Sequence, residues 1–181
     1  MAERLRAKGV PECILQVDAP WSHDQAVKFD AAARLAFRDE HRLDEKFVVM
    51  YSGNHSPCHP LDTVLAAAEI LATDDRVHFM FVGGGSEFQK VQSFATEKKL
   101  SNITTLPYQS LDMLSGSVSS PDLHLVVMGD PFVGIVHPCK IYNILSIGTP
   151  FLFIGPQESH VGDLSARMTA PHHARMAQQG D

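Results

Sequence analysis

The sequence contains little that would suit a disulfide-stabilised or membrane-spanning protein. Only three of its 181 residues are cysteine, and they lie far apart along the chain. A disulfide framework is therefore not expected, and the cysteines are read as reduced thiols. No apolar run approaches the roughly 18 residues that a membrane span needs. The first dozen residues also lack the apolar core of a signal peptide, so the sequence predicts a soluble, cytoplasmic protein.

Positive charge is scarce as well. Fifteen Lys and Arg oppose 21 Asp and Glu, which gives a net charge of −6, and no dense basic block is present. Without a basic face the protein cannot neutralise a run of phosphates, so nucleic acid is not an expected partner. The hydrophobic fraction of 44% and the charged fraction of 20% are ordinary for a folded globular domain.

Several catalytic motifs are missing. The sequence has neither a GxSxG nucleophile elbow nor an HExxH, which leaves hydrolase chemistry without support. The glycine after the first expected strand is not part of a GxGxxG, which disfavours a dinucleotide oxidoreductase. Cysteine and histidine adjoin at Cys58-His59 and at His137-Pro138-Cys139, but their spacing fits no zinc pattern. We therefore expect no metal site and no cofactor.

What the sequence does contain is an alternation of short apolar runs with segments of helical period, which is the sign of a βαβ architecture. The expected strands are residues 47–51, 77–82, 103–106, 123–128 and 151–154. Helices are expected at about 31–41, 61–72, 86–95, 110–115 and 138–147. The predicted fold class is α/β: a Rossmann-like parallel sheet with helices on both faces, wound by right-handed crossovers.

The same pattern predicts three segments along the chain. Residues 1–45 are expected to form a lead-in, with Trp21 in a turn flanked by proline. Residues 46–165 form the Rossmann-like domain. Residues 166–181 are polar and His-rich, with His172 and His173, and are expected to form a tail in which the domain ends early.

Ligands of parallel sheets bind at the carboxyl ends of the strands, so the loops there are the candidate sites. Gly53 follows the first strand and Gly83-Gly84-Gly85 follow the second. Glycine lets backbone approach a ligand closely, although Gly53 could equally be part of a plain turn and the three glycines, taken alone, favour one.

Lys140 falls in the first turn of an expected helix, where a cation opposes the helix dipole. An anion bound between the helix end and the ammonium would remove this conflict. Lys140 is therefore a candidate ligand for a diphosphate, and the alternative is a solvated surface lysine.

Taken together, residues 9–165 resemble a known family. Five runs carry the resemblance in order: FVVMYSGNHSPCHPLDTVLAAAEIL, VHFMFVGGGSEFQKV, LPYQSLDML, DLHLVVM and HPCKIYNILSIGTPFLFIGP. They are similar to the carboxyl-terminal, nucleotide-sugar-binding domain of GT-B glycosyltransferases of the family 4 (glycosyl transferases group 1) type. The resemblance implies one half of a GT-B fold, with a donor such as a UDP- or GDP-sugar bound in a cleft between two Rossmann-like domains and without a metal.

The resemblance implies donor contacts at ten positions: Gly53, Asn54, Gly83, Gly84, Tyr108, Gln109, His137, Cys139, Lys140 and Asn143. Gly53 and Asn54 would face the donor phosphates or the sugar. Gly83 and Gly84 would border the nucleoside. The next two belong to the loop that holds the base. The last four lie in a segment similar to the family's PSK-type variant, in which lysine and helix amides hold the diphosphate and neutralise the leaving group.

The sequence departs from the EX7E pattern that is commoner in this family. Counting back from Gly148, the two glutamates would fall on Ile135 and Asn143, and neither residue is acidic. A carboxylate that binds the ribose and a first glutamate at the reacting sugar therefore have no counterpart here, and the catalytic residues stay unassigned.

For function, the resemblance implies that residues 46–165 are the donor-binding domain of a glycosyltransferase. Such an enzyme transfers a sugar from a nucleotide-diphosphate sugar, with retention and without a metal, to an unknown sugar, lipid or protein acceptor. The missing amino-terminal domain would be a partner, and the fragment alone is expected to be inactive and to self-associate through its exposed cleft face. The full-length enzyme would be cytoplasmic and peripheral to the inner membrane. The alternative is a non-catalytic Rossmann-like nucleotide-binding or interaction module.

Overall fold

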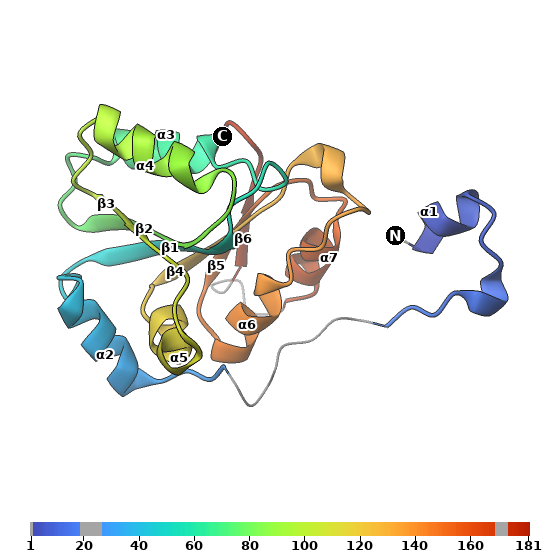
Figure 1. The fold of residues 1–181 in the computed structure, drawn as a ribbon, viewed down its shortest axis with the longest axis horizontal. Coiled ribbons are helices and arrows are strands. Elements are labelled where there is room, and N and C mark those ends of the chain that lie inside the picture. The colour runs from blue at the N-terminus through green and yellow to red at the C-terminus, as the bar shows by residue number, and fades with distance from the viewer. Residues whose placement is uncertain (1, 19–26, 169–173) are drawn as a thin grey trace.

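The computed structural model describes residues 2–18, 27–168 and 174–181. Trp21, His172 and His173 lie outside these residues. The described strands form one parallel sheet in the order β3-β2-β1-β4-β5-β6 (Figure 1). The strands are β1 (Phe47–Asn54), β2 (Val77–Gly84), β3 (Ile103–Leu106), β4 (Leu123–Val127), β5 (Phe151–Ile154) and β6 (Ala174–Ala177).

Helices cover both faces of this sheet (Figure 1). The helices of the described residues are α1 (Ala2–Ala7), which does not cover the sheet, α2 (Ala31–Glu40), α3 (Asp62–Ile70), α4 (Phe88–Glu97), α5 (Leu111–Ser119), α6 (Lys140–Ile147) and α7 (His160–Arg167). Figure 1 shows α3 and α4 on one face and α2, α5, α6 and α7 on the other. The predicted α/β class, with a Rossmann-like parallel sheet between helix layers, is confirmed. No helix in the described ranges is both long enough and apolar enough to cross a membrane.

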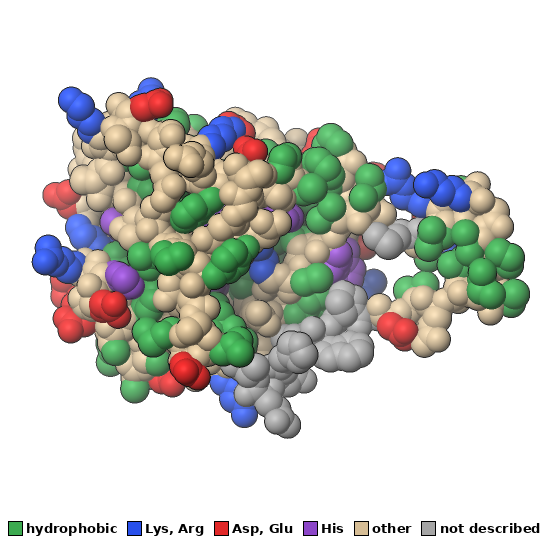
Figure 2. Space-filling model, viewed as in Figure 1, with side chains coloured by type: hydrophobic (Ala, Val, Ile, Leu, Met, Phe, Trp, Pro, Cys, Tyr) green, Lys and Arg blue, Asp and Glu red, His purple; other side chains and the backbone are tan. Residues whose placement is uncertain are grey.

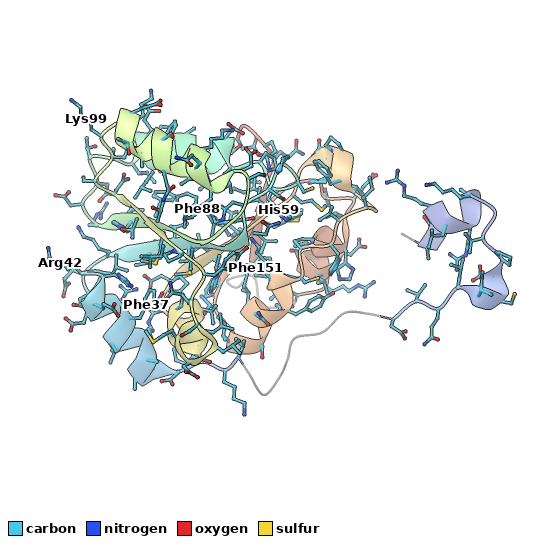
Figure 3. The ribbon with its side chains drawn as sticks, in the orientation of Figure 1. Phe37, Arg42, His59, Phe88, Lys99 and Phe151 are labelled. Atoms are coloured by element: carbon cyan, nitrogen blue, oxygen red, sulfur yellow. The ribbon has the colours of Figure 1, made fainter. Side chains whose placement is uncertain are left out.

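The apolar runs form strands because both faces of the sheet are covered. Successive side chains of a strand point to opposite faces, so a strand without alternation needs apolar cover on each side. In β1, Val49 and Tyr51 pack in the cluster with α3 and α4, whereas Val48 and Met50 pack in the cluster with Phe37 of α2. Phe37 is labelled in Figure 3.

The two ends of the chain differ from the expected boundaries. Residues 1–45, expected to be a lead-in, supply Val27, Phe37 and Leu43, which are only 1–2% exposed. Residues 166–181, expected to be a polar tail, supply β6, which pairs with β5 in parallel. Its sequence, ARMA, is too short and too mixed to show a strand pattern, so pairing with β5 rather than local propensity makes it a strand.

Arg38 shows why the lead-in belongs to the fold. Its side chain is 6% exposed and donates hydrogen bonds to the carbonyl oxygens of Leu43 (2.8 Å) and Lys46 (2.6 Å), and to that of Ser120 (2.9 Å). It also pairs with Asp122 Oδ2 at 3.0 Å. One guanidinium thereby joins α2, the approach to β1 and the approach to β4.

A local glycine cap ends α6, whereas a tertiary contact fixes the start of α4. Gly148 ends α6 at φ 71° and donates its N–H to the carbonyl oxygens of Ile144 and Leu145, as expected of a glycine cap. Ser86 and Gln89 have the spacing of a capping box in the sequence, but α4 begins at Phe88 without a side-chain cap. A tertiary contact fixes this start instead: the N–H of Glu87 donates to the His55 carbonyl at 3.0 Å.

Residues 2–18 stand apart from the sheet and the helices that cover it (Figure 1). None of the residues of α1 or of the following 3-10 turn, Glu12–Ile14, is buried. Hydrophobic side chains gather on this arm, as Figure 2 shows. Arg4 Nη1 donates a hydrogen bond to the Val133 carbonyl, in the body of the protein, at 3.4 Å.

Candidate functional site

The carboxyl ends of β1 and β2 lie unusually close together. Gly53 stands opposite Gly83 in the parallel register, and Asn54 stands opposite Gly84. Gly83 has φ 134°, and a Cβ there would overlap the Gly53 carbonyl oxygen and lie 2.9 Å from its carbon. Glycine at position 83 therefore serves a close approach of two backbones rather than a flexible turn. This pairing also extends β1 and β2 beyond their expected ends.

Lys140 reaches from the first turn of α6 to this glycine edge. Its Nζ lies 3.2 Å from the centroid of the Tyr51 ring. The same atom lies 3.5 Å from the position that a Cβ on Gly53 would take. The ammonium nitrogen is buried and has no hydrogen-bond partner among the described residues. Lys140 is therefore not a solvated surface lysine.

The surroundings of Lys140 leave its charge poorly compensated. A cation–π contact in a dry site contributes about 2 kcal/mol. Removing an ammonium from water costs more, on the order of several kcal/mol. Burial accordingly lowers the pKa of Lys140 well below its usual 10.5. An anion next to Nζ would supply the missing partner, and it would also suit the positive end of α6.

His55 forms a hydrogen bond with the Gly53 peptide. Nδ1 of its buried ring lies 3.0 Å from the Gly53 carbonyl oxygen, so the neutral ring must donate its Nδ1–H to that oxygen. The ring meets Tyr51 and Phe88 edge-on, each at 4.8 Å between centroids (Phe88 is labelled in Figure 3). Burial, and next the charge of Lys140, lower the pKa of His55 to about 4. Its Nε2 has no partner among the described residues.

His59, also labelled in Figure 3, lies in the loop after β1. Its Nδ1 is 2.7 Å from the Val127 carbonyl oxygen of β4. Burial and then the charge of Lys140 lower the pKa of His59. Over the described ranges, no three His, Cys, Asp or Glu side chains group as ligands for a metal ion.

Tyr108 covers Gly84, the last residue of β2. Its ring lies 3.1 Å from the Cβ position of Gly84, and its hydroxyl donates to the Gly84 carbonyl at 3.4 Å. The residue is 61% exposed, so one face of the ring is open to a ligand. Its neighbour Gln109 turns back on its own loop and donates to the Pro107 carbonyl at 2.9 Å.

His137 lies in a cluster of rings with Tyr142 and His160. Its Nε2 lies 2.9 Å from the Tyr142 hydroxyl, which lies 2.8 Å from Nε2 of His160. Partial burial and then His160 lower the pKa of His137. Cys139 is exposed and occupies the N-cap of α6 without a side-chain cap bond. Asn143 follows Lys140 by three residues, on the same side of α6.

The structure thus brings six of the ten expected residues into one continuous patch: Gly53, Asn54, Gly83, Gly84, Tyr108 and Lys140. Sequence reasoning missed Tyr51, which contacts Lys140, and His55, which contacts Gly53. An aromatic residue in a buried strand is indistinguishable from core in the sequence, and only the fold places Tyr51 against Lys140. No sequence signal marked the contact of His137 with Tyr142 and His160.

The sheet order, the two helix layers and the glycine edge are those of one Rossmann-like half of a GT-B glycosyltransferase. No protein-family model matches the chain. Over 121 residues, 67% of this chain, it is 31% identical to WcaI of Escherichia coli (strain K12), described as a colanic acid biosynthesis glycosyl transferase. The match spans 30% of that protein.

Solved structures share the fold at low sequence identity. HepE of Anabaena, solved with UDP-glucose, has a TM-score of 0.74 and 12% identity over 99% of this chain and 48% of its own. The carboxyl-terminal domain of LpcC, a glycosyl transferase group 1 family protein from Francisella tularensis, has a TM-score of 0.65 and 7% identity, covering 88% of this chain and 81% of that domain. The expected resemblance to the carboxyl-terminal half of GT-B glycosyltransferases is confirmed. The chain spans less than half the length of WcaI and of HepE.

Proposed function

We propose that this chain binds the diphosphate of a nucleotide-sugar donor and forms the donor-binding part of a glycosyltransferase. The observation that carries the proposal is the buried ammonium of Lys140, which lies beside Gly53 without a hydrogen-bond partner among the described residues. A diphosphate is the anion that a Rossmann-like strand edge with a following helix suits. The crystal structures of HepE with UDP and with UDP-glucose support the same ligand class.

We propose the remaining contacts as the family resemblance implies them. Gly53 and Asn54 would face the phosphates or the sugar, and Gly83 and Gly84 would border the nucleoside. Tyr108 presents an open ring face next to Gly84, where a base can stack. The backbone N–H groups of Cys139 and Lys140, at the start of α6, would share the diphosphate with the ammonium. His137, Gln109 and Asn143 would line the outer part of the site.

The transfer itself needs groups beyond this patch. We propose metal-independent transfer, because Lys140 and the end of α6 can neutralise a leaving diphosphate. We also propose that the transfer proceeds with retention, as the family resemblance implies. The acceptor would be held by an amino-terminal domain across the cleft, in an enzyme that is cytoplasmic and peripheral to the inner membrane. Exposed apolar side chains at the carboxyl edge, such as Leu111 at 81%, would contact that domain or a second copy. The chain alone is then inactive, and sedimentation at high concentration should show self-association.

Backbone NMR tests the donor site directly. Adding UDP, GDP or ADP to the labelled chain should shift amides in loops 52–59, 83–86 and 138–143 for at least one nucleotide. Lys140→Ala should weaken this binding strongly, whereas Lys28→Ala, which removes an exposed lysine before α2, should leave it unchanged. The absence of shifts in all three loops with every nucleotide would refute the proposal.

A binding module without catalysis is a second candidate, because Ile135 and Asn143 replace the two glutamates of the commoner motif. The two candidates differ when a longer protein that contains this chain is assayed for transfer. The glycosyltransferase proposal expects sugar transfer that Lys140→Ala abolishes. Transfer that is equal in the wild type and in Lys140→Ala would favour the second candidate.

A further inference from the structure

The side chains described around the Lys140 ammonium do not neutralise its positive charge. On the β1 side it meets the face of the Tyr51 ring, and the rings of His55 and His59 follow in the next loop. Both imidazoles direct Nδ1 at a backbone carbonyl, so neither offers the ammonium an anion. The described ion pairs leave Lys140 without a carboxylate partner.

We propose that the Lys140 site takes up a proton together with its anion, so that the amine is fully charged only when a phosphate lies against it. The inference rests on the proposed function, because it concerns the same anion. It adds that donor binding depends on pH through a buried lysine rather than through an exposed one.

The physical reason is a competition between burial and charge. Burial lowers the pKa of Lys140 well below 10.5, and an adjacent phosphate stabilises the ammonium and raises that pKa again. Between the two pKa values, binding takes up one proton, and each unit of pH increase weakens the affinity about tenfold. Phosphate binding would raise the pKa of each histidine too.

The histidines can be separated from Lys140 by the choice of pH. The pKa of His55 is about 4, and that of His59 is also lowered, so both are neutral at pH 8. The pKa of His124 in β4, which also interacts with the Lys140 charge, is about 4, and Cys58 and Tyr108 are further titratable groups near Tyr51. Proton uptake at pH 8 that disappears when Lys140 is replaced therefore identifies Lys140.

Calorimetry at pH 8 tests the inference. UDP-glucose, GDP-mannose and ADP-glucose are titrated in turn, because their diphosphates are esterified at both ends and do not titrate near neutral pH. The binding enthalpy is measured in Tris and in Bicine, whose ionisation enthalpies differ, and the slope against ionisation enthalpy counts the protons taken up. We expect a positive slope for the wild type, which means net proton uptake on binding. The matched variant Lys140→Arg is charged at every pH used, so it should bind with a slope of zero.

Each outcome decides a different point. Binding with a slope of zero in the wild type overturns the proton-linked inference and leaves the proposed function standing. A slope that persists in Lys140→Arg overturns the assignment to Lys140. If none of the three nucleotide sugars binds the wild type, both the proposed function and the inference fail. The wild-type slope alone is decisive should the arginine variant not fold.

Discussion

Replacing Gly83 by alanine is the most direct test of the glycine edge. Its φ of 134° lies in a region that is essentially reserved for glycine, which costs an alanine about 1–3 kcal/mol. The new Cβ would also overlap the backbone of Gly53, and forcing apart packed groups costs about 1–3 kcal/mol more. The expected loss of unfolding free energy is therefore about 2–6 kcal/mol. Gly148→Ala is the matched control, because Gly148 has φ 71° but no atom within 4 Å of its Cβ position.

The control should lose about 1–2 kcal/mol, the cost of a left-handed backbone alone. In a thermal melt followed by circular dichroism, Gly83→Ala should lower Tm by on the order of 10 °C and Gly148→Ala by about 4 °C. Urea titrations should give the same ranking. A Gly83→Ala protein no less stable than Gly148→Ala would refute the close approach of β1 and β2 and restore the flexible-turn interpretation.

Three further predictions concern buried charge. Arg38→Met should lower the unfolding free energy by about 2–4 kcal/mol, because it removes a buried side-chain donor to three carbonyl oxygens and one of the two guanidinium partners of Asp122, which keeps Arg34; a urea midpoint equal to that of the wild type would contradict this. Burial lowers the pKa of His55 and His124 from 6.5 to about 4, so the unfolded chain binds more protons and stability should fall as pH drops from about 6.5 towards 4, by about 3 kcal/mol for His124; a flat urea midpoint over this range would be inconsistent. Lys140→Met should raise the unfolding free energy at pH 7 by about 1 kcal/mol or more, because it removes a buried amine that folding leaves either charged and unpaired or deprotonated at a cost, and a lower midpoint would count against that burial.

Much of the fold could be predicted from local sequence because its strands are apolar runs buried on both faces. The five expected strands and the helix cap at Gly148 depend on side-chain composition and on one backbone conformation, both of which are local. The start of α4 could not be predicted in this way, because a backbone bond from Glu87 to His55 sets it. The same holds for β6, whose hydrogen bonds come from β5.

The candidate site, too, could be predicted from the sequence only in part. The sequence shows that glycines follow two strands and that Lys140 opens a helix, which was enough to predict an anion ligand at the carboxyl edge. It left open whether Gly83 served a turn or a close approach, and whether Lys140 was solvated. Both answers depend on distances between segments, namely Gly83 to Gly53 and Lys140 to Tyr51.

By itself, the sequence determined the α/β class, the strand order along the chain and the edge at which a ligand would bind, because these follow from periodicity and from the geometry of parallel sheets. Only the tertiary structure decided that the lead-in and the last residues complete the sheet and its cover. It also decided that the Lys140 ammonium lies buried on an aromatic ring. Burial and charge compensation are properties of neighbours in space, and residues 51, 53 and 140 become neighbours only when the sheet and α6 have assembled.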